Sequence, residues 1–249
     1  MTDATDTIAT SGAVSLSTEA GVATLLLTRP ERANAMDAEF FRAVGGALEV
    51  VAADESVRVV VLAGEGRHFC AGGDLRHPLF DDPDPRSRRR QIEAAYDVTN
   101  LMLDLDVPIV SALHGRIAGA ATAMVLATDI RVAAPSTVFS LDFVRLGLSP
   151  DMGVCYLLAP AVGTGRALEM ALTGDLVDAE KALAWGLVSR VVEEGRQREA
   201  ALDVAMQLLE HPRGGMGSIR RLIRQAPFMD RAAGFDAEIT SINRLIPSD

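Results

Sequence analysis

Hydrophobic residues recur along the chain in two alternating patterns, which together predict an α/β protein. Short β-branched runs predict buried strands at residues 22–27, 57–62, 109–113 and 129–133. Apolar residues spaced three or four apart predict helices at residues 37–51, 88–105, 119–127, 166–172, 196–210, 216–225 and 229–245. Strands and helices alternate until about residue 192, and helices dominate afterwards. We therefore expect a core over residues 1–192 and a C-terminal helical segment over residues 193–249.

Two glycine-rich turns each follow a β-branched run. Residues 68–75 read HFCAGGDL, and residues 114–120 read HGRIAGA. Small residues let a ligand approach the backbone closely, and two such turns can aim two backbone N–H groups at one point. Donors that converge where negative charge develops form an oxyanion hole, and losing one of them costs ~3–4 kcal/mol of transition-state stabilisation. The pattern therefore predicts enolate or acyl chemistry.

These turns resemble those of the crotonase family, also called the enoyl-CoA hydratase/isomerase superfamily. The family's first turn reads F-C-A-G-x-D-L and its second N-G-x-a-x-G-g-G. The resemblance covers nearly the whole chain, because residues 28–36 (TRPERANAM), 127–133 (ATDIRVA) and 179–188 (AEKALAWGLV) also follow the family's order. It implies a crotonase-like ββα superhelix with a C-terminal helical segment. We prefer that fold to a doubly wound sheet because no G-x-G-x-x-G follows the first strand.

The resemblance also implies which residues meet the ligand, an acyl-CoA thioester. It puts the oxyanion N–H groups at Gly73 and Ala120. The implied adenine and pantetheine contacts lie near Arg32, Ala33, Ala35, Ala71, Asp74 and Leu75. Because coenzyme A is part of the substrate, we expect no separate cofactor.

The residues available for proton transfer differ from those of the family's hydratases. Hydratases place two glutamates about the substrate's double bond, and the matching positions here are Ala123 and Phe143, neither of which can ionise. Asp151 matches the position from which the family's double-bond isomerases supply an acidic residue, and residues 139–148 look closest to the ring-epoxide isomerases. Its mostly apolar surroundings push the pKa of a carboxyl group upward, which makes Asp151 a better base near neutral pH.

Other roles and other carboxylates stay open at this stage. Asp151 could instead cap the helix that follows it. Asp142 is the next candidate, and with Phe143 it is expected to border the substrate. Tyr96 and Asp97 belong to the helix that the family uses to line its acyl pocket.

We therefore expect a crotonase-fold enzyme that shifts a double bond, or rearranges a strained ring, by proton transfer through a thioester enolate. Gly73 and Ala120 would hold the oxygen while Asp151 acts as acid and base. Three other classes also fit: a hydratase or other lyase that recruits Asp142, a hydrolase or dehalogenase-like enzyme with Asp151 as nucleophile, and a non-catalytic CoA-binding protein.

Composition narrows the class of protein further. A net charge of −10 argues against nucleic acid or an anionic membrane as the main partner. The two cysteines, Cys70 and Cys155, are too few for a disulfide framework and lack metal-ligand spacing, so we expect a reduced cytoplasmic protein without a metal site. Residues 1–17 lack the pattern of a secretory signal, and residues 1–12 are expected to form a flexible tail. The family resemblance implies a homotrimer or a dimer of trimers.

Overall fold

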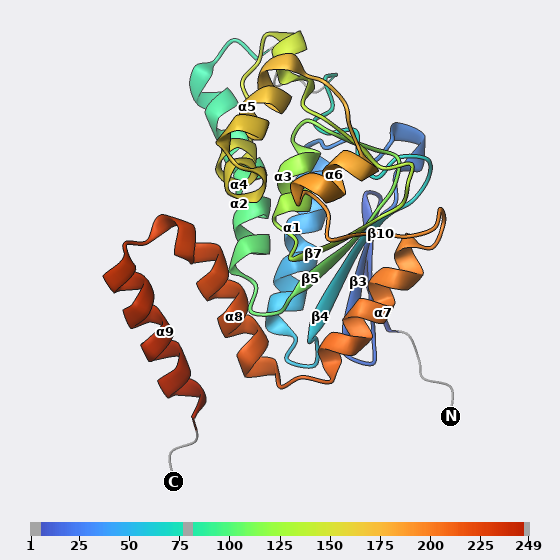
Figure 1. The fold of residues 1–249 in the computed structure, drawn as a ribbon. Helices are drawn as coiled ribbons and strands as arrows, with labels where there is room; N and C mark the ends of the chain where they lie inside the picture. The colour runs from blue at the N-terminus through green and yellow to red at the C-terminus, as the bar shows by residue number, and fades with distance from the viewer. Residues whose placement is uncertain (1–5, 77–81, 247–249) are drawn as a thin grey trace.

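The computed structural model describes residues 6–76 and 82–246 as an α/β fold with two sheets (Figure 1). The larger sheet has the strand order β1-β2-β3-β4-β5-β7-β10 and the smaller one β6-β8-β9. The strands are β1 (Asp6–Ser11), β2 (Val14–Glu19), β3 (Val22–Leu27), β4 (Val59–Gly64), β5 (Ile109–Leu113), β6 (Arg116–Ala118), β7 (Ile130–Ala133), β8 (Val138–Ser140), β9 (Val177–Asp178) and β10 (Arg190–Val191). In the larger sheet β1, β2 and β3 pair antiparallel, whereas β3, β4, β5, β7 and β10 run parallel.

Helices cover both faces of the larger sheet (Figure 1). They are α1 (Ala38–Ala53), α2 (Pro85–Asp104), α3 (Ala121–Leu126), α4 (Val154–Val162), α5 (Thr164–Thr173), α6 (Ala179–Trp185), α7 (Gln197–Leu209), α8 (Arg213–Gln225) and α9 (Arg231–Leu245). Short 3-10 turns occupy Pro30–Arg32, Asp142–Leu146 and Ala226–Phe228. In the described residues, none of these helices has the length and apolarity needed to span a bilayer.

Strand β4 shows why the sheet is buried on both faces. Its side chains alternate between two apolar cores, as expected for a central parallel strand. Val60 and Leu62 belong to the core shared with α1, α2 and α3. Val59 and Val61 belong to the core on the opposite face, where α7 packs with Ala201 and neighbouring side chains.

Helix α1 begins where the sequence predicts. The Asp37 side chain caps it by accepting a hydrogen bond from the Phe40 N–H at 2.9 Å, which satisfies one of the free donors at a helix N-terminus. The helix buries Phe40, Val44 and Leu48 against the core and packs beside α2. This pair of helices forms one side of the site described below.

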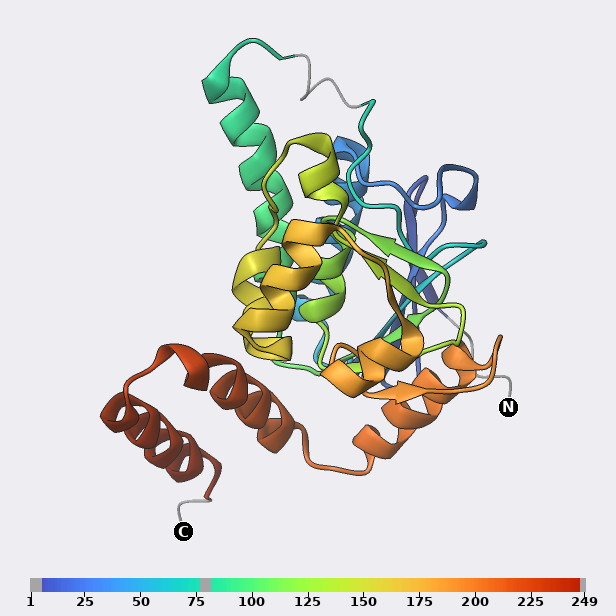
Figure 2. The same cartoon turned by 45° about the horizontal axis from the view of Figure 1, so that its top comes forward.

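The C-terminal helices α8 and α9 extend away from the body of the molecule (Figures 1 and 2). Arg220 of α8 anchors them, because its buried guanidinium donates to the carbonyls of Leu103 (2.7 Å) and Leu105 and pairs with Asp129 (2.8 Å). The first two contacts satisfy carbonyls at the end of α2 that lack helical partners. Helix α9 has no buried residue.

The predicted alternation of strands and helices is confirmed, although the structure also contains elements that the sequence did not predict, such as β2 and α6. Residues 6–11, which the sequence assigns to a flexible tail, pair with β2 as strand β1, while residues 1–5 lie outside the described part. Helix α8 starts at Arg213, three residues before its predicted start, with Pro212 as N-cap. Helix α7, predicted as part of the C-terminal segment, packs on the core sheet.

Candidate active site

The two glycine-rich turns lie side by side because backbone hydrogen bonds join them. The Cys70 N–H donates to the Arg116 carbonyl at 3.2 Å, and the Ala118 N–H donates to the Cys70 carbonyl at 3.0 Å. Just beyond, the backbone of Gly72 has a φ of +82°, and a Cβ there would lie 2.5 Å from the Ala118 oxygen. Only glycine fits this approach. The first turn is therefore locked against the second.

The backbone N–H groups of Gly73 and Ala120, which the resemblance assigns to the oxyanion hole, are unused in the described residues. Within residues 6–76 and 82–246, neither the Gly73 N–H nor the Ala120 N–H donates to a protein group. The next donor along the first turn is engaged, because the Asp74 N–H donates to the Met36 carbonyl at 2.8 Å. Free donors in a preformed turn can stabilise an oxyanion without reorganisation.

A cavity of about 620 Å³ opens beside these donors and runs between α1 and α2. Its inner end includes Met36, Gly73, Ala120, Asp151 and Met152. Its walls along the two helices include Ala38, Phe41, Gly45 and Gly46 of α1 and Ala94, Ala95, Val98 and Leu101 of α2. Charged residues of both helices stand at the solvent side: Arg42, Glu49, Arg90 and Asp97. The size is typical of a small-molecule site.

Asp151 brings a partly buried carboxylate into this cavity. Its Oδ1 is buried and has no hydrogen-bond partner among the described residues, and burial raises the pKa of its carboxyl group above the ordinary value. The N-cap of α4 is Gly153, with no side-chain hydrogen bond to the helix. The capping role considered for Asp151 is therefore wrong.

Neighbouring backbone contacts hold Asp151 in place. The Val154 N–H donates to the Asp151 carbonyl at 3.0 Å. The next residue, Met152, has a φ of +51°, and its carbonyl accepts a hydrogen bond from the buried Thr99 hydroxyl of α2 at 3.0 Å. Sequence reasoning missed Thr99, since nothing in the pattern of α2 distinguishes it from other buried positions.

Other carboxylates that line the cavity are paired or exposed. Asp37 accepts from Arg29 at 2.8 Å and from Arg32 at 3.1 Å. Burial raises the pKa of Asp37, but the hydrogen bonds from Arg29 and Phe40 outweigh it and leave that pKa below its ordinary value. Glu49 and Asp97 stand exposed at the solvent side.

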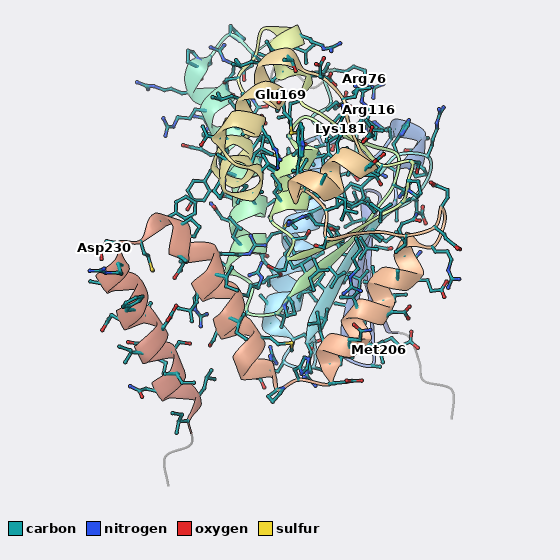
Figure 3. The ribbon with its side chains drawn as sticks, viewed as in Figure 1. Arg76, Arg116, Glu169, Lys181, Met206 and Asp230 are labelled. Carbon is teal, nitrogen blue, oxygen red and sulfur yellow. The ribbon has the colours of Figure 1, made fainter. Side chains whose placement is uncertain are left out.

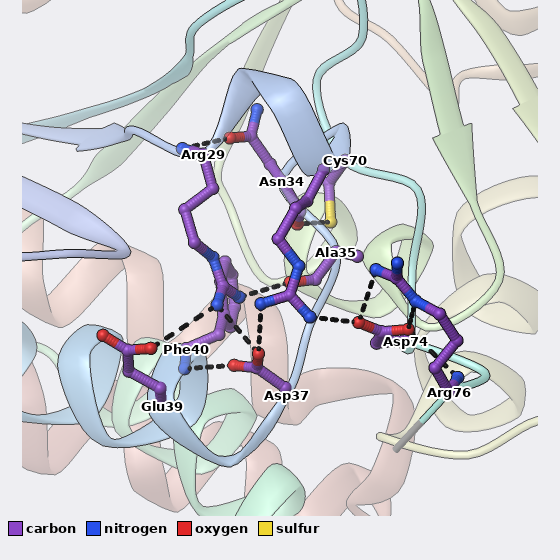
Figure 4. Close-up of polar contacts among 10 residues, drawn as sticks. Arg29, Asn34, Ala35, Asp37, Glu39, Phe40, Cys70, Asp74 and Arg76 are labelled. Atoms are coloured by element: carbon purple, nitrogen blue, oxygen red, sulfur yellow. Dashed lines mark hydrogen bonds and ion pairs between the residues drawn. The ribbon is translucent and has the colours of Figure 1, made fainter.

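Asp74 belongs to a chain of ion pairs that connects the start of α1 with the first turn (Figure 4). Its buried carboxylate accepts from Arg32 and from Arg76, the latter at 3.0 Å. The Arg76 hydrogen bond, helped by Arg32, holds the pKa of Asp74 well below its usual range despite burial. Asp74 therefore stays charged and paired, and its role is to hold the turn and the two arginines together.

The residues predicted to contact CoA gather around the same turn. The Ala71 N–H donates to the Ala33 carbonyl at 2.9 Å, so the two segments run side by side. Ala71 and Leu75 are exposed, whereas Ala35 is buried and its carbonyl accepts from Arg29. Figure 3 places Arg76 and Arg116 at this end of the molecule. The CoA contacts stay predictions.

Asp142 and Phe143 do not line the cavity. Asp142 accepts from Arg116 at 2.7 Å and from the Ser140 hydroxyl at 3.0 Å. Phe143 is buried, and a Cβ on Gly119 would lie 3.6 Å from its ring. Asp97 does line the cavity, whereas Tyr96 does not. Of the candidates, the structure thus brings Gly73, Asp74, Ala120 and Asp151 to one cavity, with Asp97 at its solvent side.

No group of three or more histidine, cysteine or carboxylate side chains in the described part of the chain is placed to hold a metal ion. Cys70 is fully buried, which raises the pKa of its thiol to about 12. Cys155 is exposed and unpaired with Cys70.

Comparison with known proteins identifies relatives that act on acyl thioesters, as the two glycine-rich turns and the cavity suggest. Residues 17–248 match the family model described as enoyl-CoA hydratase/isomerase. The chain is 36% identical to 1,2-epoxyphenylacetyl-CoA isomerase of Escherichia coli (strain K12) over 210 residues, which cover 84% of this chain and 80% of that protein. It is 32% identical to trans-2-decenoyl-[acyl-carrier-protein] isomerase of Streptococcus mutans over the same shares of each chain.

Solved structures show the same likeness in three dimensions. An enoyl-CoA hydratase from Polaromonas sp. JS666 superposes with a TM-score of 0.88 at 31% identity, covering 94% of this chain and 91% of that one. The family model, the fold and the two adjoining turns thus all indicate the same family. The chain belongs to the enoyl-CoA hydratase/isomerase, or crotonase, family of enzymes that act on acyl-CoA thioesters.

Proposed function

We propose that this protein is an acyl-CoA isomerase that moves a double bond, or opens a strained ring, through a thioester enolate. The observation that carries the proposal is the Asp151 carboxylate, whose buried Oδ1 has no partner, in the same cavity as two unused N–H groups, those of Gly73 and Ala120. Acid–base and oxyanion chemistry both need such groups close to one substrate.

The reaction needs one base and one oxyanion site. Ionised Asp151 removes a proton from the carbon next to the thioester, and the electrons move onto the thioester oxygen, where the N–H groups of Gly73 and Ala120 stabilise the charge. Asp151, now protonated, returns the proton to the γ carbon as the double bond shifts into conjugation. The cycle consumes no water and leaves Asp151 ionised again.

An isomerase fits the cavity better than a hydratase does. Hydration needs carboxylates to activate water, and the two positions that match the hydratase glutamates are Ala123 and Phe143. Both are buried apolar side chains, and neither lines the cavity. The relatives named above include isomerases and a hydratase, so the choice rests on these residues.

The test is to incubate the enzyme with a β,γ-enoyl-CoA in deuterated water and follow both product and label. We expect the conjugated α,β-enoyl-CoA carrying deuterium. A 3-hydroxyacyl-CoA as main product would indicate a hydratase, release of free CoA through a trapped acyl-enzyme would indicate that Asp151 acts as a nucleophile, and binding without any exchange would indicate a non-catalytic CoA-binding protein.

We further propose a cytoplasmic homotrimer or dimer of trimers. Helix α9 supports an assembly because, although it buries none of its residues, it carries apolar side chains that a monomer leaves exposed: Phe235, Ile239, Ile242 and Leu245. Light scattering coupled to gel filtration should give a mass at least three times 26.4 kDa, and a monomeric mass would contradict the proposal.

A further inference from the structure

Helix α1 contains two adjacent glycines, Gly45 and Gly46, near its middle. Glycine is the poorest helix former after proline, because it loses the most backbone freedom on folding. No close packing contact requires a glycine at either position. Neither has a positive φ. Outside its own stretch of helix backbone, a Cβ on Gly45 would come no closer than 3.9 Å to any atom, and a Cβ on Gly46 would have no neighbour within 4 Å.

Both glycines face the cavity. The cavity-lining residues of α1 recur with helical spacing at Ala38, Phe41, Arg42, Gly45, Gly46 and Glu49. The one atom near the missing Cβ of Gly45 is Cδ1 of Leu101, which lies on α2 and lines the cavity too. A larger side chain at Gly45 would therefore reach the opposite wall and divide the cavity.

The glycines lie well beyond the reacting centre. The start of α1 is fixed beside the oxyanion turn, because the Met36 N–H donates to the Gly72 carbonyl at 2.8 Å. Gly45 follows Ala38 by seven residues, which is about 10 Å along a helix. A four-carbon acyl group held at Gly73 ends before this point, whereas a twelve-carbon group passes it.

The cavity wall between the reacting centre and the glycines carries apolar side chains. Phe41, Ala95, Val98 and Leu101 line it, and the exposed charged side chains named above stand at its solvent side. At ~30 Å³ for each water-sized group, a volume of about 620 Å³ can take up a chain of this length. An apolar acyl group would thus be buried along most of its length.

We propose that Gly45 and Gly46 determine substrate length, and that the enzyme acts on medium- to long-chain apolar acyl-CoA esters in preference to short ones. The inference rests on the proposed function, since it assumes that the acyl group enters this cavity with its thioester at Gly73 and Ala120. The two glycines leave the passage between α1 and α2 open.

The test compares β,γ-enoyl-CoA esters of four and twelve carbons in wild type and in Gly45→Leu. We expect wild type to prefer the longer ester in kcat/KM, and Gly45→Leu to lower that preference by at least ~10²-fold, because each methylene excluded from an apolar pocket costs about 10-fold or more. Gly165→Leu is the control: Gly165 is also helical, but it is exposed, has no neighbour within 4 Å and lies outside the cavity. It should keep the wild-type preference.

A smaller substitution provides a second test in case Gly45→Leu does not fold. Gly46→Ala should raise the melting temperature by about 2–4 °C, since alanine is the best helix former, while it weakens binding of the longer ester more than that of the shorter one. Equal preference for the two esters in wild type, or an unchanged preference in a folded Gly45→Leu protein, would overturn the inference.

Calorimetry separates this inference from the proposed function. Should wild type exchange no deuterium with either ester, the proposed isomerase activity fails, and the affinities of the two esters for wild type and Gly45→Leu still decide the question of length. Should exchange occur without any dependence on length, only the inference fails.

Discussion

Replacing Asp151 by asparagine should lower activity and raise stability at the same time. Asparagine keeps the shape of the side chain and removes both the charge and the base. General-base catalysis contributes about 10²–10⁴-fold, so Asp151→Asn should lower kcat by that factor. The KM for an acyl-CoA should change little, because the base acts chiefly in the transition state.

The stability effect follows from the surroundings of the carboxylate. Its buried Oδ1 has no partner, and burial raises its pKa above the ordinary 3.8. An acid whose pKa is higher in the folded state favours folding while both states are protonated, below pH 3.8. That advantage is lost as pH rises through the raised pKa of the folded state, above which the ionised Asp151 destabilises the protein.

Asp151→Asn should therefore unfold at a higher temperature than wild type at pH 7. Asparagine is polar as well but cannot ionise, so the variant removes the cost of a buried charge, about 1–3 kcal/mol, and 1 kcal/mol corresponds to about 2–4 °C in a chain of this size. Calorimetric melting at pH 7 and below pH 4 checks the sign, since the gap between the two proteins should shrink in acid.

The matched control is Asp142→Asn. Asp142 lies outside the cavity in an exposed ion pair with Arg116, and such pairs contribute about 0–1 kcal/mol. Deuterium exchange should stay within about threefold of wild type in this control. Wild-type exchange by a folded Asp151→Asn protein would remove Asp151 from the mechanism, and a lower melting temperature at pH 7 would show that its carboxylate makes stabilising contacts.

Three further perturbations test the parts around Asp151. Gly72→Ala should lower kcat and destabilise the protein by about 2 kcal/mol or more, because its Cβ would collide with the Ala118 carbonyl at a positive φ; unchanged melting and activity would show that the turns are not locked together. Thr99→Val, which removes the hydrogen bond to Met152, should lower kcat about 10-fold with KM nearly constant, and a rise in KM alone would contradict a positioning role. Because the pKa of Asp74 is lowered in the folded protein, its ion pairs stabilise the fold fully at pH values above the ordinary pKa of aspartate. This stabilisation is lost as the pH falls through the lower pKa of the folded state. Melting temperatures measured at decreasing pH should show the loss in wild type and less of it in Asp74→Asn.

Much of the fold could be predicted, because the pattern of apolar residues is strong in segments whose side chains are buried. Strands β3 and β5 begin and end where the sequence predicts, since both are apolar runs bounded by residues that break them. The strands β6, β8 and β9 have two or three residues each, too few for a periodic signal. Strand β1, with the sequence DTIATS, resembles a polar tail and becomes a strand through pairing with β2.

The site was less accessible to sequence reasoning, because its chemistry depends on contacts between distant segments. The motifs pointed to Gly73, Ala120 and Asp151, which meet in one cavity. They could not show that Asp142 is held by Arg116, 26 residues earlier in the chain. Nor could they show that Gly45 and Gly46 face a cavity, since its opposite wall comes from α2.

Two carboxylates that line the cavity, those of Asp37 and Asp74, are stabilised by arginines, whereas the Asp151 carboxylate, which the proposed reaction uses as a base, is not. Asp37 and Asp74 each accept from arginine, and the pKa of each carboxyl group is lowered, so both are poor bases. Asp151 lies in the same cavity, where burial raises the pKa and the basicity of its carboxyl group together and Oδ1 has no hydrogen-bond partner. A local departure from good packing and pairing at one residue is typical of a functional site. The same logic applies to the glycines of α1, because an alanine would stabilise the helix and narrow the passage that the acyl chain uses.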